Sequence, residues 1–389
     1  MDGALKNLAV NELGDAVLKI VCDSNIALTP GLRALSQNIL QLPGRGITRD
    51  HLQHCDILLV RSITRVDAEL VKDTPVRFVG TATAGTDHID VPALAELGIP
   101  VAAAPGANAN AVAEYVMTAI AASGRLPDVM GGLSVGVVGY GAVGQRVATL
   151  LLAFGARPIV WDPWQVVPAQ LAAPDLESAL SQSVVTLHAS LHKTPPWPSH
   201  HFVSQRLVER IVAPQLLINA GRGGLIPRSA LTILVERGSQ LVLDTWPDEP
   251  AIDEQLLAHA LIATPHIAGY SEIAKDLATE HLVGALQRSG LIAEQPSVET
   301  SYGRTFDATA INLRQADWCE QLLLRHYPIT EDDSALRACA NPHVMAADFD
   351  RLRAHYPLRG ELRGTLLTLS GMPNVAQQQV LQGLGAQWR

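Results

Sequence analysis

The glycine-rich turn GYGAVG at 139–144 is the feature that most constrains how this chain can fold. An alternating Val/Gly run typical of a strand precedes it, and a run with helical apolar spacing follows it. In such a turn the first glycine permits a tight reversal, the second lets the backbone approach a pyrophosphate, and the third lets helix and strand pack closely. Alone the pattern is common, but between a strand and a helix it predicts a dinucleotide-binding domain. The expected cofactor contacts in the turn are Gly139, Gly141, Ala142, Val143 and Gly144.

Asp162 ends the next strand-like run, PIVW at 158–161. A carboxylate at this place is expected to accept hydrogen bonds from the adenosine ribose and to repel a 2′-phosphate. NAD is therefore favoured over NADP as the cofactor. The alternative interpretation of Asp162 is a turn residue or a helix cap.

Short apolar runs alternate with helical patterns along most of the chain, which is typical of parallel α/β layers. The first series lies at 18–24, 56–60, 76–80 and 99–105. The second lies at 134–139, 158–161, 184–188, 215–220, 240–244 and 261–266. We therefore expect an α/β fold with two Rossmann-like, doubly wound parallel-sheet domains and a cleft between them.

The two series and the residues after them predict three domains. Helical runs at 108–122 and 271–288 are expected to connect the first two. The predicted boundaries are 18–112 with 267–290 for a substrate-binding domain, 113–266 for an NAD-binding Rossmann domain and 291–389 for a C-terminal α+β domain. In the last domain, helices are expected at 308–325 and 346–355 and an apolar segment at 364–369.

Length, charge and cysteine usage exclude several classes of protein. At 389 residues the chain suits two or three domains. A net charge of −9 without a Lys/Arg stripe disfavours nucleic acid as a partner. The four cysteines form no C-x-x-C pair, so neither a disulfide framework nor a metal site is expected. No apolar run approaches the ~20 residues that span a bilayer, and no signal pattern is present, so we expect a cytoplasmic protein that binds no membrane. Residues 1–17 form an extension of unknown use.

Arg222, Glu249 and His266 each follow a run that is typical of a strand. Because the carboxyl ends of parallel strands meet at one sheet edge, all three are expected near the cofactor. His266 can take a hydroxyl proton, Glu249 can hold its imidazole, and Arg222 can bind a carboxylate with a charged planar fork. Oxidation of a 2-hydroxy acid by a nicotinamide requires these groups. Asp248 competes with Glu249 for its role, and each residue taken alone could be a structural or surface residue.

Three further features are candidates for the site. Asp244 ends the run at 240–244 and is expected to face the nicotinamide side of the cofactor, with a helix N-cap as the alternative. The loops RSITR at 61–65 and GTATAGTDHID at 80–90 follow strands, and loops of this composition cradle anions. The alternative is ordinary loop polarity. Tyr270 is expected either to hydrogen-bond the substrate or to anchor its loop.

On GTATAGTDHID, GYGAVG, NAGRG, LDTWPDEP and PHIAGY the chain resembles the D-2-hydroxyacid dehydrogenases. Within this family, VRSIT, TATAGTDH and HIAGY are similar to the subfamily that oxidises 4-phospho-D-erythronate in the pyridoxal phosphate pathway. EDDSALR at 331–337 and FDRLRAHY at 349–356 look like the C-terminal dimerisation domain of that subfamily. The resemblance thus implies a homodimer that uses NAD and a small anionic substrate.

The resemblance also implies roles for individual residues. Arg222 and Glu249 would be active-site residues, and His266 would be the proton donor or acceptor. Implied substrate contacts are Ser62, Thr83 and Tyr270. Implied cofactor contacts are Asp162, Ala189, Ala220, Gly221, Arg222, Asp244 and Gly269.

Three positions depart from the family pattern. Ala189 replaces a threonine, so any cofactor contact there is left to the backbone; Gly221 replaces a cysteine; and Pro227 replaces an aspartate at a helix start, where proline is also suitable.

Two other functions stay open. One is a dehydrogenase for another 2-hydroxy acid, such as 3-phosphoglycerate. The other is an NAD(H)-sensing interaction protein on the same fold.

Overall fold

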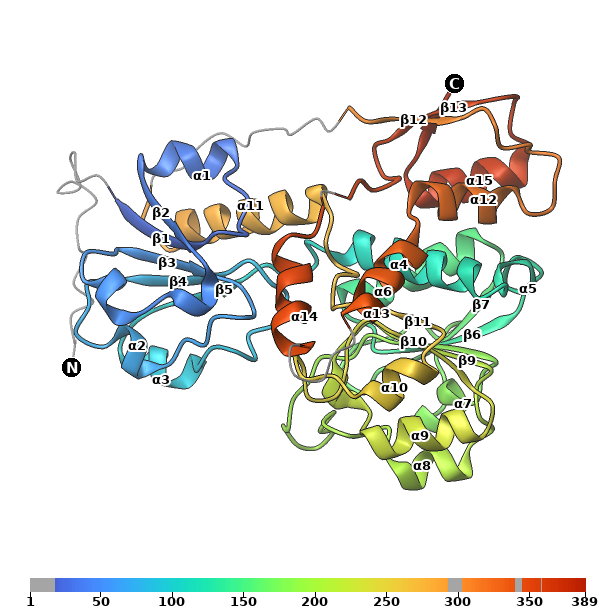
Figure 1. Ribbon diagram of the computed structural model, residues 1–389, viewed down its shortest axis with the longest axis horizontal. Coiled ribbons are helices and arrows are strands. Elements are labelled where there is room, and N and C mark those ends of the chain that lie inside the picture. Colours follow the sequence, from blue (N-terminus) through green and yellow to red (C-terminus); the bar gives the residue numbers. More distant parts are fainter. Residues whose placement is uncertain (1–17, 293–302, 340–344, 358) are drawn as a thin grey trace, which may run out of the picture. The chain divides into compact units, whose positions relative to one another are not determined.

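The structure is a computed structural model that describes residues 18–292, 303–339, 345–357 and 359–389. The extension at 1–17 lies outside the described residues. The chain divides into two compact units, residues 1–104 with 278–298 and residues 105–277 with 299–389 (Figure 1). The domain boundaries expected from the sequence remain predictions.

The first unit contains a five-stranded sheet in which all pairs are parallel. Its strands are β1 (Lys19–Asp23), β2 (Asn38–Leu42), β3 (Ile57–Val60), β4 (Phe78–Thr81) and β5 (Val101–Ala103), in the order β2-β1-β3-β4-β5. The four strands expected from the sequence are confirmed. The edge strand β2 was not expected, because only two of its five residues are even partly buried and its sequence, NILQL, lacks an apolar run.

Helices cover both faces of this sheet, so central strands such as β3 and β4 are buried at every position. Helices α1 (Pro30–Leu35) and α11 (Glu272–Arg288) pack on one face, where Leu32 and Leu282 meet Ile57 and Leu59. Helices α2 (Ala68–Val71) and α3 (Val91–Glu96) pack on the other face. Short 3₁₀ turns, η1 (Gly44–Gly46) and η2 (Arg49–Leu52), complete the unit. Only the part of α11 from Ala278 onward belongs to this unit.

The second unit contains a six-stranded parallel sheet, as the sequence predicted. Its strands are β6 (Ser134–Val138), β7 (Arg157–Trp161), β8 (Val184–Leu187), β9 (Leu216–Asn219), β10 (Gln240–Leu243) and β11 (Ile262–Ala263), in the order β11-β10-β9-β8-β6-β7. A parallel bridge between Val160 and Ala172 extends the sheet beyond β7. The strand order reverses between β6 and β8, which is where open α/β sheets bind ligands.

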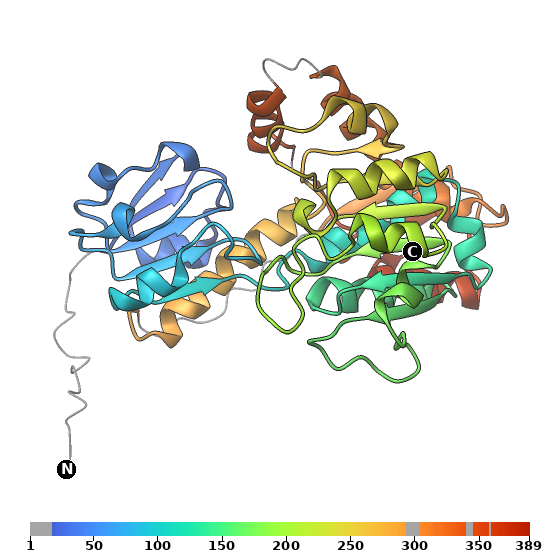
Figure 2. The same cartoon turned by 90° about the horizontal axis from the view of Figure 1, so that it is seen from below.

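Alternate residues of these strands face two separate cores. Val135 and Val137 of β6 pack with α4 (Ala109–Ala122) and α6 (Ala142–Ala153) on one face. The other face packs against α7 (Leu176–Leu180), α8 (Gln205–Arg210), α9 (Arg228–Glu236) and α10 (Glu254–His259), as Figures 1 and 2 show. The remaining short elements are α5 (Leu126–Met130) and η3 (Gly223–Leu225).

The C-terminal residues add a small parallel sheet and four helices to the second unit. The strands β12 (Thr305–Ala308), β13 (Leu366–Leu369) and β14 (Gln387–Trp388) pair in that order. The helices are α12 (Trp318–His326), α13 (Ile329–Ala338), α14 (Met345–Ala354) and α15 (Val375–Leu384). Buried residues of this part, such as Trp318 and Leu381, lie in the same core as α4 and α6. The fold class expected from the sequence is therefore confirmed, with a third small sheet.

The helix expected at 308–325 is wrong over its first half. Ala308 pairs with Leu369 in the sheet, and the helix begins only at Trp318. Between them, the side chains of Asp307 and Asn312 accept hydrogen bonds from the backbone N–H groups of Thr309 and Arg314 at 3.0 Å. Such local bonds offer the backbone an alternative to helix.

Helix α13 covers the edge strand β11. The backbone N–H of Ala263 donates to the Asp333 carboxylate at 2.7 Å, so this edge donor is satisfied. Arg337, one turn further along α13, donates to the carbonyl oxygens of Leu257 at 2.8 Å and Ala260 at 2.7 Å. These contacts join the C-terminal residues to the Rossmann sheet within one unit.

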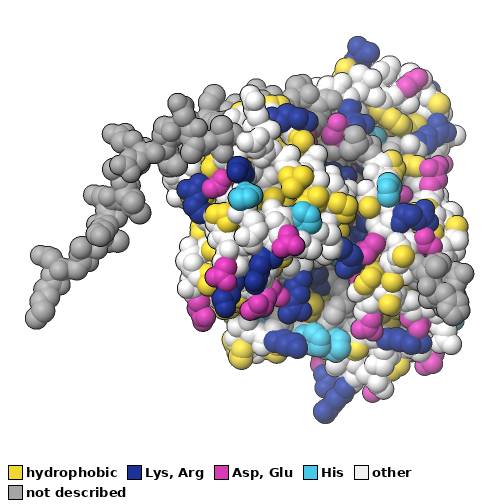
Figure 3. All heavy atoms as spheres, turned by 60° about the vertical axis from the view of Figure 1, so that its left-hand side comes forward, with side chains coloured by type: hydrophobic (Ala, Val, Ile, Leu, Met, Phe, Trp, Pro, Cys, Tyr) yellow, Lys and Arg dark blue, Asp and Glu magenta, His cyan; other side chains and the backbone are white. Residues whose placement is uncertain are grey.

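The molecular surface carries charges of both signs. On the face in Figure 3, Lys/Arg and Asp/Glu side chains are interspersed. Among the helices in the described part of the chain, none combines the length and apolar character needed to cross a bilayer.

Candidate active site

The glycine turn follows β6 and leads into α6, and each glycine in it has a separate structural reason. Gly139 has a φ of 99°, which favours glycine, and a β-carbon there would collide with the backbone of Ala189. A β-carbon on Gly144 would collide with the carbonyl oxygen of Gly139. At Gly141 nothing lies within 4 Å of the β-carbon position. The first and third glycines thus allow the turn to close, and the second leaves open space at the N-terminus of α6.

These residues fit a dinucleotide. The N-terminus of a helix offers unpaired N–H groups and a partial positive charge to a pyrophosphate. Asp162, at the end of β7, accepts the backbone N–H of Tyr140 in the turn at 2.7 Å. Its other oxygen accepts from Trp164 at 2.7 Å and Gln165 at 3.0 Å. A carboxylate has about four lone-pair sites, so Asp162 keeps capacity for a ribose hydroxyl beside the turn.

His266 and Glu249, predicted as a pair, are in direct contact. Nδ1 of His266 lies 2.8 Å from Oε2 of Glu249, and the side chains are 27% and 22% exposed. A carboxylate can only accept, so Nδ1 carries the proton and the neutral ring has its lone pair at Nε2. The imidazole is thereby held in the tautomer of a general base.

Glu249 is itself fixed by the chain around it. The backbone N–H of Trp246 donates to Oε1 of Glu249 at 2.7 Å, and the Trp246 indole donates to the carbonyl of Thr264 at 2.9 Å. Burial alone would raise the pKa of Glu249, but its contacts with His266 and the Trp246 N–H outweigh burial and lower the pKa below its ordinary value. The carboxylate therefore remains charged opposite His266.

Asp244 holds the loop that carries His266. Its Oδ1 accepts from the Thr264 hydroxyl and the Ile267 N–H, both at 2.7 Å, and its Oδ2 accepts from the Ala268 N–H at 3.0 Å. Burial raises the pKa of Asp244 above its ordinary value, although these hydrogen bonds oppose the shift. The contacts of the carboxylate in the structure are thus with its own chain, and the predicted contact with the cofactor remains a proposal.

Arg222 lies three residues after the end of β9 and just before η3, with an extended backbone. Its Nη1 donates to the carbonyl of Gly221 at 2.9 Å. A β-carbon on Gly223 would collide with the carbonyl of Trp246, so a glycine lets the Arg222 loop approach the segment leading to Glu249. At Gly221 a β-carbon would lie 2.9 Å from the carbonyl oxygen of Leu187, and therefore a cysteine does not fit there without a shift.

The remaining predicted cofactor contacts lie at the same sheet edge, after β8, β9 and β11. Ala189 lies against Gly139, and Ala220 follows β9 directly. A β-carbon on Gly269 would lie 2.5 Å from the side-chain amide of Asn108, so a larger residue there would require the Asn108 side chain to shift. Pro227 is the N-cap residue of α9, one position before the helix begins.

Ser62 and Thr83 belong to the first unit, where each follows a strand. Ser62 comes after β3 and Thr83 after the neighbouring strand β4, so both lie at the carboxyl edge of that sheet. The Thr83 hydroxyl lies 2.7 Å from the Thr81 hydroxyl and 2.8 Å from the carbonyl oxygen of Gly85. The Thr83 loop is thus held by hydroxyl groups of its own segment.

Comparison with known proteins identifies the family. Residues 113–268 match the D-isomer specific 2-hydroxyacid dehydrogenase, NAD binding domain, and residues 307–385 match a domain of unknown function, DUF3410. An erythronate-4-phosphate dehydrogenase from Pseudomonas aeruginosa (strain UCBPP-PA14) is 37% identical over 384 residues, covering 95% of this chain and 100% of that protein. This chain belongs to the erythronate-4-phosphate dehydrogenase family. A member from Marinobacter nauticus is 38% identical over 371 residues, which cover 90% of this chain and 95% of that protein. The resemblance predicted from the motifs is confirmed.

Solved structures support the fold of this family member. The 3-phosphoglycerate dehydrogenase of Entamoeba histolytica has a TM-score of 0.60 at 20% identity and covers 72% of this chain and 98% of its own. The D-lactate dehydrogenase of Aquifex aeolicus has a TM-score of 0.57 at 22% identity and covers 70% of this chain and 96% of its own. At such identities the likeness concerns the fold alone.

Sequence reasoning missed two contributors to the site. Thr264 bonds Asp244 and also lies 2.7 Å from the Tyr115 hydroxyl of α4, so it links the His266 loop to a buried helix. Arg353 of α14 is a charged neighbour of Glu249 and a hydrogen-bond partner of Tyr270. Thr264 follows a strand, which is a usable signal. Arg353 had none, because its contacts join residues far apart in the sequence.

Proposed function

We propose that this chain oxidises 4-phospho-D-erythronate to 2-oxo-3-hydroxy-4-phosphobutanoate, with His266, Glu249 and Arg222 as its catalytic residues. The observation that carries the proposal is the 2.8 Å contact between His266 and Glu249 at the sheet edge that bears the dinucleotide turn. The chain is an NAD-dependent oxidoreductase, in keeping with its matched domain and its curated relatives. We further propose a place for the reaction in pyridoxal 5′-phosphate biosynthesis.

His266 is the general base of the proposed mechanism. Its Nε2 accepts the proton of the substrate 2-hydroxyl as the alcohol becomes a carbonyl. The resulting imidazolium is stabilised by the Glu249 carboxylate at Nδ1, which the Trp246 N–H orients. NAD held at the glycine turn would supply the acceptor for the hydride that leaves C2 of the substrate. In the reverse reaction the same imidazolium returns the proton.

Arg222 is the proposed carboxylate ligand. A guanidinium is permanently charged and presents two parallel N–H donors to a carboxylate, which a lysine cannot do. Binding the carboxylate in this way orients C2 of the substrate and stabilises negative charge on its oxygen. Ser62, Thr83 and Tyr270 are proposed as further substrate contacts on the strength of the family likeness.

The proposed NAD site comprises the glycine turn and the strand ends around it. Gly139, Gly141 and Gly144 admit the pyrophosphate at the start of α6, and Asp162 accepts the adenosine ribose. Ala142, Val143, Ala189, Ala220, Gly221, Asp244 and Gly269 complete the set of proposed contacts. Because Ala189 has no hydroxyl, its part is limited to backbone groups.

A cytoplasmic location and a homodimer formed by the C-terminal residues are also proposed.

The direct test is turnover by the purified protein. NADH formation is followed with NAD and either 4-phospho-D-erythronate or D-3-phosphoglycerate, and the His266→Ala variant is the control. We expect turnover of the four-carbon substrate and a loss of roughly 10²- to 10⁴-fold in the variant, while NADH binding is kept. Preference for 3-phosphoglycerate would assign another substrate. NADH binding without turnover of either acid would point to an NAD(H)-sensing interaction protein.

A further inference from the structure

Two cations lie close to the ring of Tyr270. Nζ of Lys275 lies 5.5 Å from the ring centroid, and the guanidinium carbon of Arg353 lies 5.9 Å from it. The Tyr356 ring approaches Tyr270 edge-on, with centroids 5.9 Å apart. A chain with a net charge of −9 thus places two positive groups around one tyrosine next to the His266 loop. Both distances lie within the range of cation–π contact.

Arg353 is held from several sides. The Arg353 side chain is 10% exposed, and its guanidinium carbon lies 5.8 Å from the Phe349 ring centroid. Nη1 of Arg353 lies 3.9 Å from Oδ1 of Asp350. Arg353 hydrogen-bonds Tyr270, and Glu249 is a charged neighbour. A guanidinium has five N–H donors, so one such group can serve several acceptors at once.

Lys275 lies in the first turns of α11, five residues after Tyr270, and is half-buried. Tyr270 closes a turn onto the carbonyl of Ile267 at 2.8 Å, and the backbone N–H of Lys275 donates to the carbonyl of Ser271 at 3.0 Å. The backbone on both sides of the pair is therefore fixed. The ammonium group is a point charge with three donors, which suits an oxyanion.

We propose that Lys275, Arg353 and the Tyr270 hydroxyl bind the phosphate group of the substrate. The assignment rests on the proposed function, in which the substrate has an anion at each end. Arg222 takes the carboxylate, so the phosphate needs its own cations. Charge-assisted bonds to a guanidinium and an ammonium match a phosphate dianion, and Oδ1 of Asp350, 3.9 Å from Nη1 of Arg353, is an acidic neighbour of the guanidinium.

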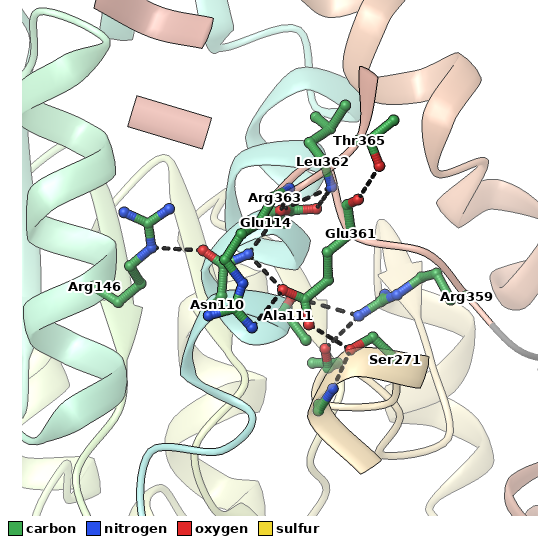
Figure 4. Close-up of polar contacts among 12 residues, drawn as sticks. Asn110, Ala111, Glu114, Arg146, Ser271, Arg359, Glu361, Leu362, Arg363 and Thr365 are labelled. Atoms are coloured by element: carbon green, nitrogen blue, oxygen red, sulfur yellow. Dashed lines mark hydrogen bonds and ion pairs between the residues drawn. The ribbon is translucent and has the colours of Figure 1, made fainter. Parts of the chain in front are cut away.

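The C-terminal segment supports the loop that carries this subsite. Arg359 donates to the carbonyl of Ala268 at 2.6 Å, and Glu361 accepts the hydroxyl of Ser271, as Figure 4 shows for the latter. Tyr270 lies between Ala268 and Ser271. The C-terminal segment thus supplies one phosphate ligand and contacts the chain on both sides of another, at the Ala268 carbonyl and the Ser271 hydroxyl. Selectivity for a phosphorylated substrate is then a property of the C-terminal residues as well as of the Rossmann domain.

The test compares a phosphorylated with an unphosphorylated substrate. The Michaelis parameters of Arg353→Met and Lys275→Met are measured with 4-phospho-D-erythronate and D-erythronate. We expect kcat/KM for the phosphorylated acid to fall roughly 10- to 100-fold, mainly through KM, because each variant loses a charge-assisted bond. D-erythronate should lose several-fold less than the phosphorylated acid, because it never makes that bond, so the ratio of the two kcat/KM values should fall. Arg353→Lys should restore part of the preference.

Arg351→Met is the matched control, because Arg351 is on the same helix, is exposed and pairs with Asp348 at 2.7 Å. It should match the parent on both substrates. NADH binding and the melting temperature report whether each variant folds. Equal losses on both substrates, or no loss in either variant, would overturn the phosphate assignment.

A second arm separates this proposal from the proposed function. If the parent protein turns over neither acid, that function fails, but inorganic phosphate still tests the subsite. Phosphate should raise the melting temperature of the parent and of Arg351→Met, and should not raise that of Arg353→Met. A phosphate effect that is the same in all three proteins would also overturn the assignment.

Discussion

The carbonyl oxygen of Gly139 occupies the place that a β-carbon on Gly144 would need. Gly141, between them in the same turn, has no atom within 4 Å of its β-carbon position. The two positions therefore exclude a side chain for different reasons: Gly144 for the fold, and Gly141 for what the turn binds.

Alanine substitutions separate these reasons. Gly144→Ala should lower the melting temperature by several degrees, because the strand-to-helix packing must shift. Gly141→Ala should melt near the parent temperature but bind NAD at least roughly tenfold more weakly, because the methyl group enters the space left for the pyrophosphate. Gly46→Ala, also with open space around it, is the control for both measurements. A normal NAD affinity in Gly141→Ala would contradict the placement of the pyrophosphate.

Asp162→Ala should weaken NAD binding and relax the rejection of NADP. The variant loses the ribose acceptor and the negative charge together. It also removes the bond to the Tyr140 N–H, so some loss for both cofactors is expected. The test is the ratio of the dissociation constants for NADPH and NADH. A lower ratio in the variant would support the ribose contact, whereas a general distortion of the turn would weaken the binding of both cofactors equally.

Glu114→Gln should change how stability depends on pH. Glu114 of α4 is buried with Glu361 in the network of Figure 4, and both bond to the Asn110 amide, at 2.8 and 2.7 Å. Burial and the neighbouring Glu361 raise the pKa of Glu114 to about 7. Hydrogen bonds from the N–H groups of Leu362 and Arg363 and the charge of Arg359 oppose this shift. Arg146 of α6 also faces the network through Asn110.

The sign follows from proton binding. Between its ordinary pKa of 4.5 and about 7, Glu114 holds its proton in the folded chain and loses it in the unfolded chain. The folded state then becomes less stable as pH rises, by about 3 kcal/mol in total. In Glu114→Gln this part of the decline should disappear, which urea unfolding at several pH values measures. The exposed Glu236→Gln is the control, and parallel curves for all three proteins would refute the assignment.

Truncation after Leu291 should damage the Rossmann domain as well as any self-association. The cut removes the partners of the Ala263 N–H and of the Leu257 and Ala260 carbonyls, and it exposes the apolar faces of α4 and α6. We expect poor solubility or a clear drop in melting temperature, with light scattering to report the association state. A soluble, fully active truncated chain would show that the C-terminal residues are dispensable for the site.

Much of the architecture could be predicted because the signals are local. Each strand of the Rossmann sheet is a short apolar run, and the glycine turn joins one of them to a helix. Glu249 and His266 follow the neighbouring strands β10 and β11, so parallel topology brings their loops to the same sheet edge. Their 2.8 Å contact fits that expectation.

The rest could not be predicted because it depends on contacts between distant residues. The Glu114 carboxylate bonds the Leu362 N–H across 248 positions, and Arg353 reaches Tyr270 from another part of the fold. Strand β2 is an exposed edge whose residues show no apolar run. The Asp244 carboxylate holds the His266 loop, a use that its sequence position does not reveal.

His266 has a φ of 56°, a left-handed conformation that costs most side chains stability and that glycine adopts freely. Three hydrogen bonds to the Asp244 side chain and one from the His266 N–H to the Asp244 carbonyl, at 2.8 Å, hold the loop in this state. Replacing His266 with glycine would relieve the conformational cost and remove the base. A directed-evolution campaign that selected for heat resistance alone would thus favour the substitution that ends activity, so such a screen must keep turnover among its criteria.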